Sequence, residues 1–219
     1  MSDIFREVDE EFKRDKFAMF LKKHGNLIIG LLLLLVIGVG GYRTWSYFEQ
    51  RKAAEAGQQF EVAMALAADG KNDEAKAAFE ALAKTAPAGY RALAQFRNAA
   101  EQAKSDPAAA VKAFDALAAD AALEQTLRDL AKVRAGLLLV DTAPLAELQQ
   151  RLEPFTAQGQ AWRLSAREAL GLAAYKAGNL DKSAQYFELV LADPEASQTI
   201  RQRAEVMMSL VRGGAVQAK

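Results

Sequence analysis

An uncharged apolar stretch at residues 25–42, GNLIIGLLLLLVIGVGGY, constrains this chain more than any other feature. A helix of that length would extend roughly 27 Å, close to the hydrocarbon core of a bilayer, which is roughly 30 Å thick. Trp45, Tyr47 and Phe48 follow it, where amphipathic rings favour the membrane–water interface. The sequence therefore predicts a transmembrane helix, which together with its interfacial border covers residues 25–48.

A cleaved signal peptide is the alternative explanation of this stretch. Signal peptides begin with a short basic segment, and a small-residue cleavage site follows their apolar part. Here residues 1–24 contain acids as well as bases, and the nearest small-x-small pattern, at residues 54–56, lies too far beyond the apolar stretch. We therefore interpret the stretch as a retained membrane anchor.

Basic residues on the two sides of the anchor indicate its orientation. Lys and Arg near a transmembrane helix favour the cytoplasmic side, whereas acidic residues contribute little. Six basic residues precede the anchor, and three follow it within a comparable distance. For the inner membrane of a bacterium, this predicts a cytoplasmic N-terminus and a periplasmic C-terminal domain. The six are Arg6, Lys13, Arg14, Lys16, Lys22 and Lys23, and the three are Arg43, Arg51 and Lys52.

Residues 1–24 are predicted to form a cytoplasmic amphipathic helix, because their apolar residues recur at intervals of three, four and seven. Such a helix can lie on the inner leaflet beside its own anchor. Alternatively, it can dock on the cytoplasmic face of a membrane partner, and small residues in the anchor can admit a partner helix. The candidate docking residues are Phe5, Val8 and Phe12, together with Gly38 and Gly41 in the anchor.

The composition excludes several classes of function. The 219 residues include 28 basic and 28 acidic ones, so the chain lacks the positive charge on which nucleic-acid binding depends. With no cysteine and a single histidine, His24, the chain has no thiolate nucleophile, no disulfide and no second histidine for a zinc site. We expect no catalysis, no cofactor and no small-molecule substrate.

Beyond the anchor the sequence is rich in alanine and lacks the β-branched and aromatic runs of period two that strands require. Helix-length segments alternate instead with short breaks that contain Gly, Pro, Asn or Asp. We therefore expect an all-α repeat domain over residues 49–212 and a disordered tail over 213–219. The predicted breaks are residues 69–72, 87–89, 105–107, 141–144, 154–159, 178–179 and 193–194.

The helical segments repeat with a period of 35 residues. A helix–turn–helix unit of about that length is typical of tetratricopeptide arrays. A small residue permits close crossing of helices, and a phenylalanine four residues later lies on the same helix face and fills the groove between hairpins. Ordinary bundling with coincidental spacing is the alternative, but several features share the interval. The matched positions are Ala75 and Ala110, Phe79 and Phe114, Leu82 and Leu117, and Gly136 and Gly171; Ser183 and Phe187 correspond in a later repeat.

The chain resembles the tetratricopeptide family, although its repeats are degenerate. Arg167 occupies the position where that family usually has Trp, and residues 127–154 have an abbreviated second helix. Together with the predicted anchor, the resemblance implies a single N-terminal transmembrane helix followed by a tetratricopeptide-like α-solenoid of helical hairpins. The matching residues are Gly70, Ala75, Phe79 and Pro87 in one repeat, and Leu170, Gly171, Gly178 and Phe187 in another.

The whole chain also resembles the bacterial family of the ancillary subunit of the SecYEG translocon (YfgM-like). The resemblance covers the opening IFREVDEEFKRDKFAMFLKKHG, the single span, the GYRTW that follows it and the divergent repeats. It implies a periplasmic repeat domain tethered beside the Sec channel, with Sec subunits, a membrane-anchored periplasmic chaperone and translocating clients as partners. A structural adaptor for cell-envelope or division machinery, without client binding, is the alternative.

An α-solenoid binds partners on the face that the first helix of each hairpin lines. Helical spacing and the family's groove positions give Glu168, Leu172, Tyr175 and Lys176 as candidate partner-binding residues. Leu172 and Tyr175 can equally be packing residues. Trp162 is a further candidate, either as a surface anchor for a partner or as a residue that packs on the neighbouring repeat.

Overall fold

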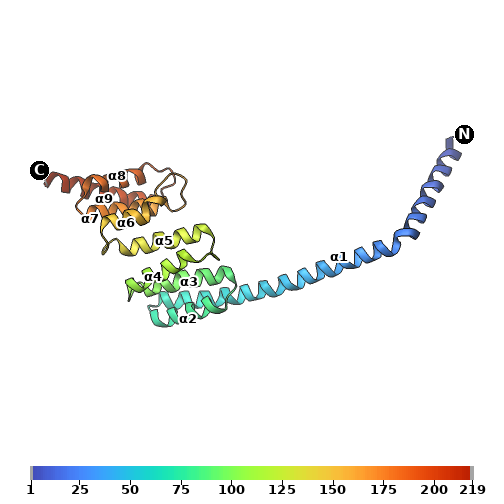
Figure 1. Cartoon of the computed structure of the whole chain (residues 1–219), viewed down its shortest axis with the longest axis horizontal. Coiled ribbons are helices and arrows are strands. Elements are labelled where there is room, and N and C mark those ends of the chain that lie inside the picture. The colour runs from blue at the N-terminus through green and yellow to red at the C-terminus, as the bar shows by residue number, and fades with distance from the viewer. Residues whose placement is uncertain (1, 218–219) are drawn as a thin grey trace. The chain divides into compact units, whose positions relative to one another are not determined.

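The computed structural model describes the backbone of residues 2–217, which forms helices joined by short turns (Figure 1). No strand occurs among these residues, and the predicted all-α class is confirmed. The chain divides into two units, Met1–Glu55 and Ala56–Lys219. The sequence had predicted the start of the repeat domain slightly earlier, at residue 49.

Helix α1, Ser2–Ala68, combines segments that the sequence treats separately. It covers the predicted amphipathic helix, the predicted anchor and the first helix of the first hairpin. Its segment Gly30–Ala68 contains a candidate membrane span by length and composition, with a mean hydropathy of 1.3. Leu31, Leu34 and Ile37 are more than 60% exposed, so these large apolar side chains have no core to pack into within the described chain.

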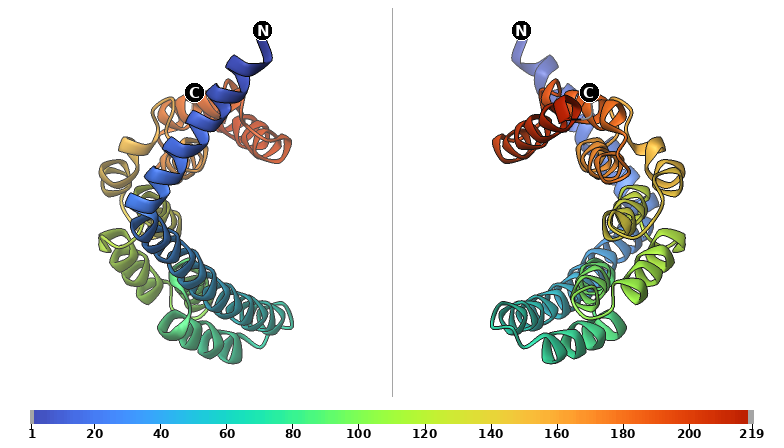
Figure 2. Two further views of the ribbon diagram at one scale, coloured as in Figure 1. Left: turned by 90° about the vertical axis from the view of Figure 1, so that its right-hand side faces the viewer. Right: turned by 90° about the vertical axis from the view of Figure 1, so that its left-hand side faces the viewer.

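The second unit consists of helical hairpins that stack in sequence order. The end of α1 pairs with α2, α3 with α4, α5 with α6, and α7 with α8, and α9 packs on α8. Figure 2 shows this unit following a curved path, with α4 and α6 on its outer side and α5 and α7 on its inner side. The bounds are α2 Asn72–Thr85, α3 Ala88–Gln102, α4 Pro107–Ala119, α5 Gln125–Leu139, α6 Leu145–Leu152, a 3-10 turn η1 Glu153–Phe155, α7 Arg163–Lys176, α8 Leu180–Leu191 and α9 Gln198–Gln217.

Each predicted break coincides with a boundary between two helices, although some of its residues belong to the first turn of the next helix or to η1, and local chemistry explains where the boundaries occur. Gly70 and Gly178 end helices with φ of 76° and 72°, a left-handed conformation that other residues rarely adopt. Asp106 and Asn179 start the following helices, because their side chains accept hydrogen bonds from backbone N–H groups three residues on, at 2.9 and 3.1 Å. These turns could be predicted because their residue types are the usual ones for helix ends.

One turn was not predicted, that at residues 120–124 between α4 and α5. Its sequence, DAALE, contains neither glycine nor proline. The Asp120 carboxylate accepts a hydrogen bond from the backbone N–H of Ala122 at 2.9 Å and so stabilises the turn. An aspartate of this kind is a weaker sequence signal than glycine or proline.

The repeated small and large residues form the core of the second unit. Phe79 and Phe187 are completely buried and Phe114 nearly so, while Ala75, Ala110 and Ser183 one turn earlier are also completely buried. The Phe79 ring packs against Phe60 of α1 at 5.5 Å between centroids, and the Phe114 ring packs against Phe96 of α3 at 6.0 Å. These residues have the equivalent packing roles that the 35-residue period predicted.

Gly136 and Gly171 repeat because a large side chain of the partner helix lies against each of them. A Cβ atom on Gly136 would lie 2.7 Å from Leu152, and one on Gly171 would lie 2.9 Å from Phe187. Both distances are shorter than van der Waals contact allows, so a larger residue would force the facing side chain to shift. Leu152 of the short helix α6 therefore takes the place that Phe187 has in α8.

The length of α6 and the end of α9 concern two further predictions. The abbreviated second helix between residues 127 and 154 is α6, which has 8 residues. Helix α9 continues to Gln217, so residues 213–217, which the sequence assigned to a disordered tail, are helical.

A buried ionic cluster fixes the last repeat, and Asp193 is its centre. Its fully buried carboxylate accepts hydrogen bonds from Arg163 Nε at 2.6 Å and Nη2 at 2.9 Å, and from Arg167 Nη1 at 2.9 Å. The hydrogen bonds from Arg163, with smaller contributions from the Glu195 backbone N–H and Arg167, lower the pKa of Asp193 to about 2, although burial acts in the opposite direction. The carboxylate is therefore ionised at neutral pH.

Arg167, which departs from the usual tetratricopeptide pattern, has a structural role in this cluster. Besides its bond to Asp193, its guanidinium donates to the backbone oxygens of Thr156 at 2.8 Å and Leu189 at 3.1 Å. It thus connects α7 to the loop before it and to the end of α8. An arginine can make several such bonds at once because it has five N–H donors in a rigid arrangement.

Candidate functional site

The first helices of the hairpins and the last helix, α9, carry most of the exposed large apolar side chains that the structure describes in the second unit. Val62 on α1, Leu93 on α3, and Val206 and Leu210 on α9 are each 47–62% exposed. On second helices, Leu189 of α8 is the comparable exposed residue within the described range. Two of these side chains, Val62 and Leu93, lie on first helices, which line the binding face of a repeat array.

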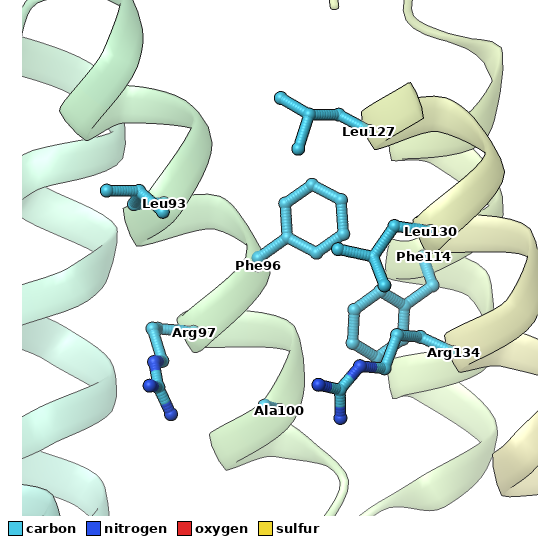
Figure 3. A pocket seen from close by; sticks show the side chains of 8 residues that line it. All are labelled: Leu93, Phe96, Arg97, Ala100, Phe114, Leu127, Leu130 and Arg134. Carbon is cyan, nitrogen blue, oxygen red and sulfur yellow. The ribbon is translucent and has the colours of Figure 1, made fainter. Parts of the chain in front are cut away.

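A cavity of about 240 Å³ lies between α3 and α5 (Figure 3). Its wall is mainly apolar, and the Phe114 ring of α4 contributes to its base. Figure 3 shows Leu127 at one end of the cavity, and Arg97 and Arg134 at the other end on either side of Ala100. The full lining is Leu93, Phe96, Arg97, Ala100, Phe114, Leu127, Leu130 and Arg134.

A second cavity, of about 450 Å³, adjoins the first between α5 and α7 and reaches Arg203 of α9. The two cavities share Leu130 and Arg134 of α5, so they adjoin each other along the first helices. We call the two adjoining cavities together the first-helix groove. The second cavity is lined by Leu130, Val133, Arg134, Leu137, Trp162, Ser165, Glu168, Leu172 and Arg203.

The charges of the first-helix groove are unbalanced. Glu168 accepts two hydrogen bonds from Arg203, at 2.6 and 2.8 Å, and this pair raises the pKa of Arg203. Arg97 and Arg134 are exposed, and neither makes a hydrogen bond or an ion pair with any residue in the described part of the chain. Two positive charges of the groove are therefore uncompensated.

The structure brings three of the predicted partner-binding residues together. Trp162, Glu168 and Leu172 line the same cavity, whereas Tyr175 and Lys176 lie further along α7 and do not line it. Trp162 also has a packing role, because its Nε1 donates to the backbone oxygen of Thr126 at 2.9 Å and its ring lies against the neighbouring core.

Sequence analysis missed the half of the groove between α3 and α5. Leu93 and Arg97 recur as Leu130 and Arg134, an interval of 37 residues that differs from the period of 35 seen in the second helices. The longer interval includes the turn at residues 120–124 that was not predicted. A search for charged and apolar residues that recur together at a second interval could have found these positions.

The predicted docking residues of the N-terminal segment and the anchor belong to the first unit of the chain. Phe5, Val8 and Phe12 lie outside the residues whose side chains the structure describes. A Cβ atom added to Gly38 or Gly41 would meet nothing within 4 Å. These glycines therefore have room for a neighbouring helix, and their role in docking stays a prediction.

An apolar depression with guanidinium groups at its edge can bind a protein segment by burying apolar side chains and pairing with carboxylates. The stacked hairpins define the class of the protein: an α-helical repeat protein, a class that generally binds protein partners. The chain belongs to the tetratricopeptide repeat-like domain family, whose sequence model matches residues 18–210. The match begins before the candidate membrane span and ends in α9. Among curated proteins and among solved structures, none matches the chain.

Proposed function

We propose that this protein is a membrane-anchored periplasmic interaction module that is ancillary to the SecYEG translocon and its periplasmic chaperone network. Its function is the non-catalytic binding of partner or translocating proteins. The observation that carries the binding function is the first-helix groove, with its apolar wall and uncompensated arginines. The assignment to the translocon depends on the resemblance of the N-terminal segment, the span and GYRTW to the YfgM-like family.

The proposed topology has a cytoplasmic N-terminus and a periplasmic repeat unit. Its support is the excess of basic residues before the span, together with the exposed leucines of α1, which a bilayer would cover.

We expect alkaline phosphatase fused after Lys219 to be active in a bacterial host, because this reporter requires export. Green fluorescent protein fused at the same point through the Sec route should be dark. Fusions that truncate the chain at Lys23, before the span, serve as the opposite control. An inactive phosphatase fusion together with a fluorescent green fluorescent protein fusion after Lys219 would overturn the periplasmic assignment.

The partner proposal predicts which positions contact other proteins. A photo-crosslinking amino acid in place of Trp45, beside the span, should capture a Sec channel subunit or a membrane-anchored chaperone. The same amino acid in place of Leu172 should capture a chaperone or a translocating client, because Leu172 is a half-buried residue of the groove. Lys112 is exposed on α4 and lines neither cavity of the groove, so it is the matched control.

Mass spectrometry of the adducts checks this prediction. If neither Trp45 nor Leu172 captures these partners while the protein is well expressed, the translocon assignment is wrong.

The location of a fluorescent fusion in the cell distinguishes the proposed function from the alternative one, because an adaptor of the division machinery would form a ring at midcell. An even distribution around the membrane is the result that we expect.

A further inference from the structure

We infer that the half of the first-helix groove between α3 and α5 binds an acidic, apolar peptide segment of a partner protein. In this segment, Leu or Phe side chains would alternate with Asp or Glu. The inference depends on the proposed interaction function and specifies the chemistry of the partner. It is carried by the apolar cavity and by the two arginines at its edge.

The apolar wall defines the first requirement for the ligand. Leu93 is 50% exposed, and Phe96, Leu127 and Leu130 are partly exposed, although the chain buries other side chains of the same types. A large apolar side chain of a partner would cover these surfaces and remove them from water, which is favourable in proportion to the area covered. The cavity volume of about 240 Å³ provides space for such a side chain.

The charges define the second requirement. Arg97 and Arg134 lie at the same end of the cavity (Figure 3) and have no anionic partner within the described chain. The acidic residue of the adjoining cavity, Glu168, is already paired with Arg203 through both carboxylate oxygens. An incoming carboxylate therefore has free guanidinium groups to bind, whereas an incoming Lys or Arg would be repelled.

The two arginines occupy equivalent positions in consecutive hairpins. Leu93 and Arg97 on α3 are one helical turn apart, as are Leu130 and Arg134 on α5. Each hairpin therefore presents an apolar residue and a cation on the same helix face. A ligand that alternates apolar and acidic residues would match both hairpins at once.

Fluorescence anisotropy with the full chain in phosphatidylcholine nanodiscs tests this inference. The probe is a short fluorescein-labelled peptide in which Leu and Phe alternate with Asp and Glu, and empty nanodiscs give the background. A second peptide has Asn and Gln in place of the acids, and a third has Ser in place of the apolar residues. We expect the first peptide to bind at least about tenfold more tightly than either of the others, a difference of about 1.4 kcal/mol.

Variants of exposed residues identify the site without changing the core. The double variant Arg97→Gln/Arg134→Gln should bind the acidic peptide no better than its amide counterpart. Leu93→Ser should weaken the binding of the acidic peptide and of the amide peptide to the same extent, because both contain Leu and Phe. Arg212→Gln removes another exposed arginine, outside the groove, and should behave as the wild type. Added salt should reduce the preference for acids, because it screens exposed charges.

Three results would overturn the inference: equal binding of the acidic and amide peptides, equal binding of the Ser peptide, or an unchanged preference in the double variant. These results are distinguishable from failure of the proposed function. If crosslinks from Leu172 persist while the acidic preference is absent, the inference fails and the interaction function stands. If the preference is present but no Sec or chaperone adduct forms, the peptide site stands and the translocon assignment fails.

Discussion

Phe79→Ala and Phe114→Ala should each lower the melting temperature of the repeat unit by roughly 6–20 °C. Both side chains are buried between helices, and truncation of a buried Phe usually costs about 3–5 kcal/mol. That is a large part of the roughly 5–15 kcal/mol that stabilises a typical domain. In a domain of this size, 1 kcal/mol corresponds to about 2–4 °C. Thermal unfolding of the full chain in detergent, followed by circular dichroism, measures the change.

Controls and opposite changes make this prediction specific to the packing of the repeats. Leu93→Ala truncates a half-exposed apolar residue and should have a much smaller effect. Ala75→Leu and Ala110→Leu should also destabilise the unit, because there is no space beside these completely buried residues and a larger side chain would force the helices apart. If both Phe variants melt at the wild-type temperature, the two residues are not equivalent core positions and the predicted register of the repeats is wrong.

Asp193→Asn should destabilise the last repeat to a similar degree at neutral pH. The substitution removes the negative charge that compensates Arg163 and Arg167 in a buried site. Breaking a buried ionic group in this way usually costs about 3–5 kcal/mol, because the remaining charges stay away from water. Glu195→Gln is the matched control, since its exposed carboxylate contacts Arg163 at the edge of the cluster.

The pH dependence of the difference between Asp193→Asn and the wild type provides a second test. Folding lowers the pKa of Asp193 to about 2, below the value of about 3.9 in an unfolded chain. The ionised carboxylate therefore contributes stability above about pH 4, and this contribution is lost as the pH falls through about 2. Melting temperatures measured from pH 7 to pH 2 should converge for the two proteins. A difference that stays constant down to pH 2 would contradict the role of the ionised carboxylate.

The sequence determined the helical class, the candidate span and most helix boundaries, because these depend on local properties. The apolar stretch at residues 25–42 exceeds what a core helix needs, and Gly70 and Gly178 end helices through their own backbone freedom. The repeated Ala and Phe positions were also recognisable, since a crossing of two helices requires a small residue near a large one in every hairpin. The turn at residues 120–124 was not predicted, because it contains neither glycine nor proline and its side-chain stabilisation is the hydrogen bond to the Asp120 carboxylate.

The tertiary structure alone decided that Arg97 and Arg134 line one cavity of the first-helix groove and that Asp193 is the centre of a buried ionic cluster. Arg97 and Arg134 line the same cavity only when two hairpins stack. Arg163 forms hydrogen bonds with Asp193, which is 30 residues away in the sequence. In the sequence, the recurrence of Leu93 and Arg97 as Leu130 and Arg134 is visible, but it does not show whether an arginine is paired, as Arg163 is, or exposed, as Arg212 is. Periodicity specifies which face of a helix is apolar, whereas the stacking of hairpins determines whether an arginine is buried with an aspartate or left unpaired beside an apolar cavity.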